Sequence, residues 1–238
     1  MIQLSIELNM KNTLKSYPMP FTRLELCILS VVDGELCVLL GKREEEPAMG
    51  LWAMPGGVLR IDLDADLEAA ARRVATERLG HDIGVALPYL KQQCAVGGPE
   101  RDPRAPWSLS IIYRALVPIE SFAPLPGKRL TDLKWTSADR ASTDRTTAFD
   151  HHQRIAAAVS DLRREVEGMD IPLDFFGSEF TLGELQSGCE HLLGYGLDKS
   201  SFRRKLDERQ LVRPVAGEFR HGANRPAQLF TKASQAEI

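Results

Sequence analysis

A glycine pair that leads into a helix-forming run is the feature that most constrains how this chain can fold. Pro55 precedes Gly56 and Gly57, and an alanine-rich run follows at 66–79 and ends at Gly80. Paired glycines let a backbone approach a phosphate group closely, although the same pair also occurs in plain turns. The segment therefore predicts a loop and helix that border a binding site for a phosphorylated ligand.

One face of this predicted helix determines whether the site can hold a metal ion. Positions 74, 77 and 78 are neighbours on a helix surface, and carboxylates there would supply the oxygen ligands that Mg²⁺ prefers. The chain has Val74, Glu77 and Arg78 instead, so one carboxylate lies beside a guanidinium whose positive charge opposes a cation. Three aspartates of the preceding loop offer other oxygens and leave a metal site open as an alternative: Asp62, Asp64 and Asp66.

This stretch resembles a Nudix box, the loop-helix motif of enzymes that hydrolyse nucleoside diphosphates linked to another group. The family pattern ends its helix on Arg-Glu-x-x-Glu-Glu-x-Gly, whereas residues 73–80 read Arg-Val-Ala-Thr-Glu-Arg-Leu-Gly. The interval from Gly57 to Gly80 is also two residues longer than in that pattern. The resemblance implies a Nudix-like domain that binds a ligand without a catalytic metal or other cofactor, and hence a protein that is not an enzyme.

Charge is distributed unevenly along the chain. The net charge of −3 predicts no general affinity for nucleic acid, and 43% apolar with 26% charged residues is typical of a soluble globular protein. Residues 198–232, however, hold nine Lys or Arg against four acids, so this segment is +5 and the remainder is −8. Such segregation is typical of a nucleic-acid-binding surface, although a solvated helix face remains an alternative. Residues 1–16 lack a long apolar run, so we expect no signal peptide and no membrane span, and a cytoplasmic protein.

The first two thirds of the chain predict strands around one helix. Asp33 and Gly34 separate two apolar runs, at 24–32 and 35–40, which is a hairpin pattern. The alanine-rich run gives the helix, at 66–79. Further strands are expected at 89–96, 107–117 and 130–135. This order predicts an α+β sandwich rather than a doubly wound sheet.

The remaining third predicts helices and a hairpin. Apolar residues recur at helical spacing over 148–167, a stripe that includes Phe149 and His152 and on which we expect His152 to be a core residue. Thr181 and Glu184 form a capping-box pattern, and Asp198 begins a second helix with Phe202 inward. Two short strands, 211–215 and 228–231, follow with a turn at Gly217 and a basic loop at 220–226. Two helices and a hairpin with a basic tip are typical of a winged helix-turn-helix.

Together these segments resemble the Nudix-related transcriptional regulators of the NrtR type. The resemblance is carried by residues 51–57, 101–104, 148–151, 180–186 and 197–206, and the last three lie outside the box. It implies a Nudix-like α/β/α sandwich at 18–145 followed by a winged-helix domain at 146–238. It also implies a homodimeric repressor of NAD-metabolism genes that binds a palindromic operator in double-stranded DNA and releases it on binding ADP-ribose or a related nucleotide. The alternative is a Nudix hydrolase with an accessory winged helix.

Two sets of residues are the candidates for these functions. Trp52 and Trp107 could stack on an adenine ring or could simply pack in the core. Arginine side chains are suited to bidentate binding of phosphate. The expected effector-binding residues are Arg43, Trp52, Gly56, Gly57, Glu77, Arg78, Arg101 and Arg104. The expected DNA-binding residues are Lys199, Ser200, Ser201, Arg203, Arg204 and Lys205 on the second helix, and Arg220, His221 and Arg225 on the wing.

Overall fold

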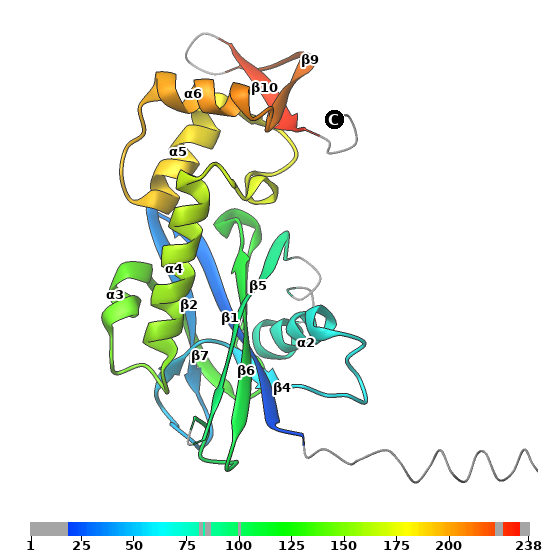
Figure 1. Cartoon of the computed structure of the whole chain (residues 1–238), viewed down its shortest axis with the longest axis vertical. Helices are drawn as coiled ribbons and strands as arrows, with labels where there is room; N and C mark the ends of the chain where they lie inside the picture. Colours follow the sequence, from blue (N-terminus) through cyan, green and yellow to red (C-terminus); the bar gives the residue numbers. More distant parts are fainter. Residues whose placement is uncertain (1–18, 81–82, 84–86, 100, 222–225, 234–238) are drawn as a thin grey trace, which may run out of the picture.

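The computed structural model describes residues 19–80, 83, 87–99, 101–221 and 226–233. A mixed sheet with helices on both faces forms one part, and a helical part with a small sheet lies at the other end of the molecule (Figure 1). Among the described residues, no helix is long and apolar enough to cross a membrane.

The larger sheet is built around the long first strand. Its central order is β3-β2-β1-β6-β5, with β4 paired to β1 and β7 paired to β2, and β1 runs parallel to β6. Asp33 and Gly34 both have positive φ at the turn between β1 and β2, which confirms the predicted hairpin. The strands are β1 (Phe21–Val32), β2 (Glu35–Arg43), β3 (Trp52–Ala53), β4 (Gly56–Val58), β5 (Tyr89–Gly98), β6 (Ser108–Leu116) and β7 (Leu130–Ser137).

Helices cover the two faces of this sheet. Helix α2 (Leu67–Leu79) packs its Val74 and Ala70 against Leu24 and Leu26 of β1. The opposite face is covered by α3 (Ala138–Thr143) and α4 (His151–Glu167). Short 3₁₀ turns lie at Ile119–Ser121 and Leu173–Phe176. Alternate β1 side chains pack into these two cores, which confirms the predicted α/β/α sandwich.

Helix α4 begins later than its apolar pattern predicts. Phe149 has a φ of 57°, outside helical values, and Asp150 is the N-cap residue. The prediction that His152 lies in the core is therefore wrong: His151 is the buried histidine and His152 is only half-buried. The backbone N–H of Met54 donates to Nδ1 of His151 at 2.9 Å, which satisfies a polar atom that burial would otherwise leave unpaired.

The second part of the molecule is a winged helix. It comprises β8 (Phe180–Thr181), α5 (Leu182–Leu193), α6 (Lys199–Glu208), β9 (Val212–Arg220) and β10 (Ala227–Lys232). The capping box is confirmed, since Thr181 Oγ1 accepts from Glu184 N–H and the Glu184 carboxylate accepts from Thr181 N–H. The predicted turn at Gly217 is wrong. Gly217 lies inside β9 with φ 76°, beside a register shift of β10 where Gln228 donates to two β9 carbonyls.

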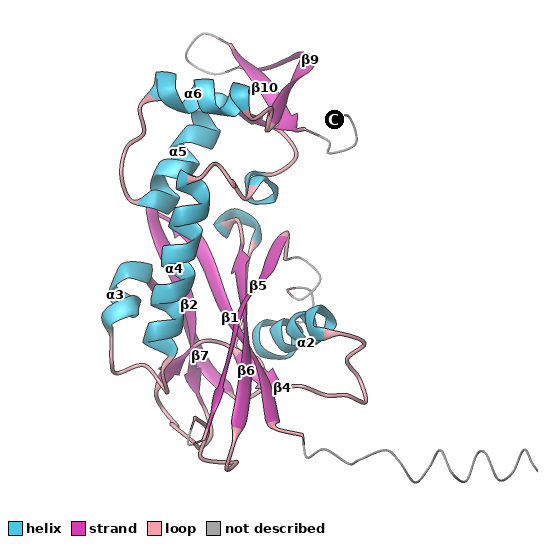
Figure 2. Ribbon diagram, viewed as in Figure 1, coloured by secondary structure: helices cyan, strands magenta, loops and turns pink. Residues whose placement is uncertain are grey.

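One apolar cluster joins the two parts. It holds Leu36 and Val38 of the large sheet, Val159 of α4, and Leu185 and Phe202 of the winged helix. Helix α4 runs from the sheet toward α5 (Figure 2). Arg163 of α4 pairs with Asp139 at 2.7 Å and donates to the Leu192 carbonyl of α5. A displacement of α4 would therefore also displace the winged helix.

Candidate functional site

The backbone of Gly57 packs directly against the side chains of α2. A Cβ at Gly57 would lie only 2.7 Å from a methyl of Val74, so this close approach requires glycine. Asp66 caps α2 by accepting from Ala69 N–H at 2.7 Å. Arg73 donates to the Val58 carbonyl and pairs with Asp64 at 2.6 Å, which fixes the loop onto the helix.

The two helix positions at which the Nudix pattern has metal-binding carboxylates, 74 and 78, hold residues with structural roles in this chain. Val74 is fully buried, and Arg78 donates to the carbonyls of Gly56 and Lys128 at 2.8 and 3.1 Å. Burial lowers the pKa of Arg78, while the carboxylate of Glu77 favours its charged form. Glu77 lies within 4 Å of three cationic side chains: Arg73, Arg78 and Lys128.

The aspartates of the lengthened loop are also engaged. Asp62 pairs with Arg60 at 2.6 Å, Asp64 pairs with Arg73, and Asp66 caps α2. In the part of the chain that the structure describes, no group of three His, Cys, Asp or Glu is arranged to hold a metal ion. The residues at the box therefore do not fit a Mg²⁺ site.

Five arginines line a narrow cleft beside the glycine pair. Its free volume is about 30 Å³, room for only one or two water molecules, so a ligand must move side chains to enter. Burial, reinforced by repulsion from neighbouring arginines, lowers the pKa of Arg23 and of Arg43. Such a concentration of guanidinium groups favours an anion. The charged lining residues are Arg23, Arg43, Glu45, Glu46, Arg78, Arg104 and Arg129.

The structure brings together five of the eight expected effector residues. Arg43, Gly56, Gly57, Arg78 and Arg104 line this arginine cleft.

Trp52, Glu77 and Arg101 lie outside the arginine cleft. The Trp52 ring is covered by the ammonium of Lys134 at 4.3 Å, and its backbone carbonyl accepts from Ala148 N–H. Sequence reasoning missed Arg23 and Arg129. Arg23 had a usable signal, because it is one of only two charged residues in a mostly apolar strand; Arg129 had none.

Arg101 belongs to a buried ionic network next to the cleft. Its guanidinium pairs with Glu25 at 3.1 Å and with Asp150, the N-cap residue of α4, and it donates to Ser110 Oγ. Burial by itself would raise the pKa of Glu25, but His151, Arg101 and Arg23 outweigh it and lower this pKa to about 2. The network connects β1, β6, the loop that begins at Arg101 and the start of α4.

The second helix of the winged helix presents a basic surface. Phe202 and Leu206 are buried, while Lys199, Ser200, Arg203, Arg204 and Lys205 are exposed and Ser201 is half-exposed. Arg204 lies 3.9 Å from Glu208. On the wing, Arg220 pairs with Glu184 at 2.5 Å and His221 is exposed. Arg225, also expected to contact DNA, lies outside the described residues.

Family models match both parts of the chain. The NUDIX domain model matches residues 22–159, and the model of the NrtR DNA-binding winged helix domain matches residues 172–231. Fold and site thus define a Nudix-related protein that carries a DNA-binding winged helix. The chain belongs to the NrtR family, which confirms the resemblance inferred from the sequence.

Named relatives extend over most of the chain. The ADPR responsive transcriptional repressor NtrR of Acinetobacter baylyi is 33% identical over 219 residues, which covers 92% of this chain and 84% of that protein. Shewanella oneidensis NrtR complexed with a 27mer DNA superposes with a TM-score of 0.73 at 30% identity, covering 89% and 93% of the two chains. The NUDIX domain of the Shewanella protein complexed with ADP ribose gives a TM-score of 0.56 at 31% identity, covering 66% and 97%.

Proposed function

We propose that this chain is a cytoplasmic, homodimeric transcriptional repressor of NAD-metabolism genes. It binds a palindromic operator and releases it when ADP-ribose or a related nucleotide enters the arginine cleft. The observation that carries the proposal is the presence, in one chain, of an exposed basic helix on a winged helix and a cleft with five arginines. Relatives described as an ADPR-responsive repressor and as a DNA complex support it.

The basic helix α6 is suited to enter the major groove, with its N-terminal half nearest the base edges, as helix-turn-helix proteins dock. The wing then reaches the DNA backbone, where Arg220 exchanges its carboxylate partner Glu184 for a phosphate group. A twofold dimer reads half-sites spaced by about one helical turn, roughly 10–10.5 base pairs, or a multiple of it. Because these contacts are largely ionic, binding weakens steeply with salt.

Effector binding has a physical route to the DNA-binding part. Arg104 of the cleft binds Asp102, and the adjacent Arg101 pairs with Asp150 at the start of α4. The other half of α4 contacts α5 through Arg163 and the shared apolar cluster. A ligand that draws Arg104 toward its phosphates therefore pulls on the loop that anchors α4.

The cleft arginines should control effector affinity. We expect Arg104→Ala to weaken ADP-ribose binding about ten-fold or more, because a charge-assisted hydrogen bond to phosphate contributes roughly 1.5–3 kcal/mol. Asp102 keeps Arg23 at 3.6 Å in this variant, so its buried carboxylate retains a cation. Isothermal calorimetry measures the change, and Arg140→Ala, which removes an exposed arginine from α3, is the control. Equal affinity in parent, variant and control would place the phosphates elsewhere.

A hydrolase is the competing function, and the box disfavours it. With Mg²⁺ or Mn²⁺ we expect no turnover of ADP-ribose at enzymatic rates of about 1 per second or more. The reason is that Val74 and Arg78 occupy two of the three carboxylate positions and Glu77 is surrounded by cations. Chromatographic detection of AMP release, with an active Nudix hydrolase as positive control, provides the measurement. Release at such rates would make this chain an enzyme.

A further inference from the structure

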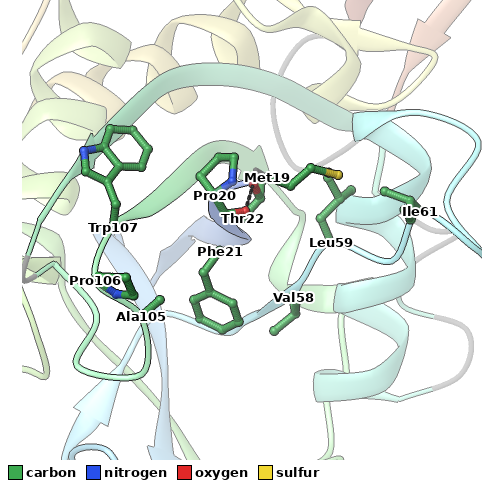
Figure 3. A pocket seen from close by; sticks show the side chains of 10 residues that line it. All are labelled: Met19, Pro20, Phe21, Thr22, Val58, Leu59, Ile61, Ala105, Pro106 and Trp107. Carbon is green, nitrogen blue, oxygen red and sulfur yellow. Dashed lines mark hydrogen bonds between the residues drawn. The ribbon is translucent and has the colours of Figure 1, made fainter. Parts of the chain in front are cut away.

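An apolar cavity of about 650 Å³ adjoins the arginine cleft. Figure 3 shows Trp107 on one side of it, Ile61 on the other and Phe21 between them. Val58 lines both the cavity and the cleft, so the two form one region of the Nudix-like part. At the other end of the molecule (Figure 1), a charged contact within the winged helix bears on DNA binding instead.

This charged contact joins helix α5 to the wing. Arg220, the last residue of β9, donates from Nη1 to Oε1 of Glu184 at 2.5 Å. Glu184 is the third residue of α5, so it meets the wing from the helix that precedes the basic helix α6. The side chains of Arg220 and Glu184 are 47% and 45% exposed, so the pair is open to solvent and to an approaching duplex.

The capping box holds the Glu184 carboxylate in place. Its other oxygen, Oε2, accepts from the backbone N–H of Thr181 at 2.8 Å, and Thr181 in β8 pairs with Leu229 of β10. Burial by itself would raise the pKa of Glu184, but the hydrogen bonds from Thr181 and Arg220 outweigh it and lower this pKa. The carboxylate is therefore charged at neutral pH and cannot follow Arg220 when the arginine turns away.

A DNA phosphate has to compete with this carboxylate for Arg220. Phosphate contacts supply the part of DNA binding that does not depend on sequence. When Arg220 turns to a phosphate, its ion pair with Glu184 is lost, and the carboxylate is left beside the negative charge of the DNA. Both effects oppose binding, and neither depends on the bases that α6 contacts.

Two other acids of the winged helix are less suited to this role. Asp198 caps α6, where it accepts from Ser201 N–H at 2.7 Å, so its charge is directed to the helix end. Glu208 lies 3.9 Å from Arg204, a longer contact between two more exposed side chains. Glu184 differs from both because it accepts a short hydrogen bond from a wing arginine while the backbone fixes its second oxygen.

We propose that Glu184 is a determinant of DNA affinity, which weakens binding to DNA of any sequence by holding Arg220. The inference rests on the proposed function, because it requires the wing to contact DNA, and it deepens that function by naming the residue that opposes the contact. A low sequence-independent affinity makes binding depend on the contacts of α6 with bases. It also eases release of the operator when the effector binds.

Glu184→Gln tests the inference in the full-length chain, because glutamine also serves at this position of a capping box. The variant should melt close to the parent but lose the ion pair. At low salt it should bind labelled operator and a random duplex about two- to five-fold more tightly than the parent, the range typical of an exposed ion pair. Fluorescence anisotropy measures both affinities, and the gain should shrink at high salt, which screens exposed charges.

Two controls separate the ion pair from a general effect of charge. Glu120→Gln removes the same charge from an exposed residue of the Nudix-like part and should bind DNA like the parent. Arg220→Ala removes the partner of Glu184. In that background, Glu184→Gln should change the affinity by less than about two-fold, because no arginine remains to be released.

The outcomes distinguish this inference from the proposed function. Unchanged or weaker binding by Glu184→Gln would overturn the inference, and weaker binding would mean that Glu184 orients Arg220 toward DNA. An equal gain in Glu120→Gln, or in the Arg220→Ala background, would overturn it as well. The expected gain in a protein that keeps its operator when ADP-ribose is added would contradict the regulatory function and leave the role of Glu184 standing. A parent protein that binds no DNA would overturn both.

Discussion

Arg203→Ala/Arg204→Ala should bind the operator about 100-fold or more weakly than the parent at matched salt. Each arginine that makes a bidentate contact to guanine contributes about 1–3 kcal/mol to the binding free energy and to sequence selectivity. An arginine that contacts only a phosphate contributes to affinity for every sequence and little to selectivity. Both side chains are exposed on α6, whereas Phe202 and Leu206 on its other edge are buried against the winged-helix core. The substitutions therefore leave the packing of α6 intact and remove only the contacts it offers to DNA.

A charge-matched control distinguishes base or phosphate contacts from a general effect of net charge. Arg140→Ala/Arg145→Ala also removes two exposed arginines, but from the sheet-bearing part near α3. Because the chain has a net charge of −3, both double variants reach −5 and are repelled by the duplex to the same extent at long range. Fluorescence anisotropy with labelled operator should show a large loss only for the α6 variant. Parent-like binding by that variant would mean that another surface reads the DNA.

The elements of the fold were predictable because they rest on local chemistry. The hairpin follows from Asp33 and Gly34, which tolerate positive φ, and α5 follows from the reciprocal bonds of Thr181 and Glu184. The predictions that were wrong concern residues whose position depends on contacts with residues distant in the sequence. His151 replaces His152 in the core because Met54, 97 residues earlier, donates to its ring.

The arginine cleft was only partly predictable for the same reason. Gly56, Gly57 and Arg78 belong to one motif and lie together, since Arg78 donates to the Gly56 carbonyl. Arg23 and Arg129 come from a strand and a loop that only the folded sheet brings to the motif. Trp52 directly precedes Ala53, which lines the cleft, so strand alternation turns the Trp52 ring to the opposite side, where Lys134 covers it.

Glu25→Gln should destabilise the protein by about 3 kcal/mol at pH 7, the second large effect we expect. The carboxylate is almost fully buried and faces Arg101, Arg23 and His151, so removing its charge leaves buried guanidinium groups under-compensated. Breaking a buried ion pair typically costs about 3–5 kcal/mol. The Glu25 pKa falls from 4.5 to about 2 on folding, which corresponds to a contribution of about 3 kcal/mol.

The sign of the shift fixes the pH dependence of this contribution. Because the folded-state pKa lies below the unfolded value, the stabilisation is fully present above about pH 4.5 and is lost as the pH falls toward 2. Urea unfolding at pH 7, 5 and 3 should therefore show parent and Glu25→Gln well separated at pH 7 and 5 and converging at pH 3. Glu120→Gln, at an exposed glutamate of the Ile119–Ser121 turn, is the control and should follow the parent. A parent–variant difference that stays constant to pH 3 would show that packing of the side chain, rather than its charge among the arginines, is what Glu25 contributes.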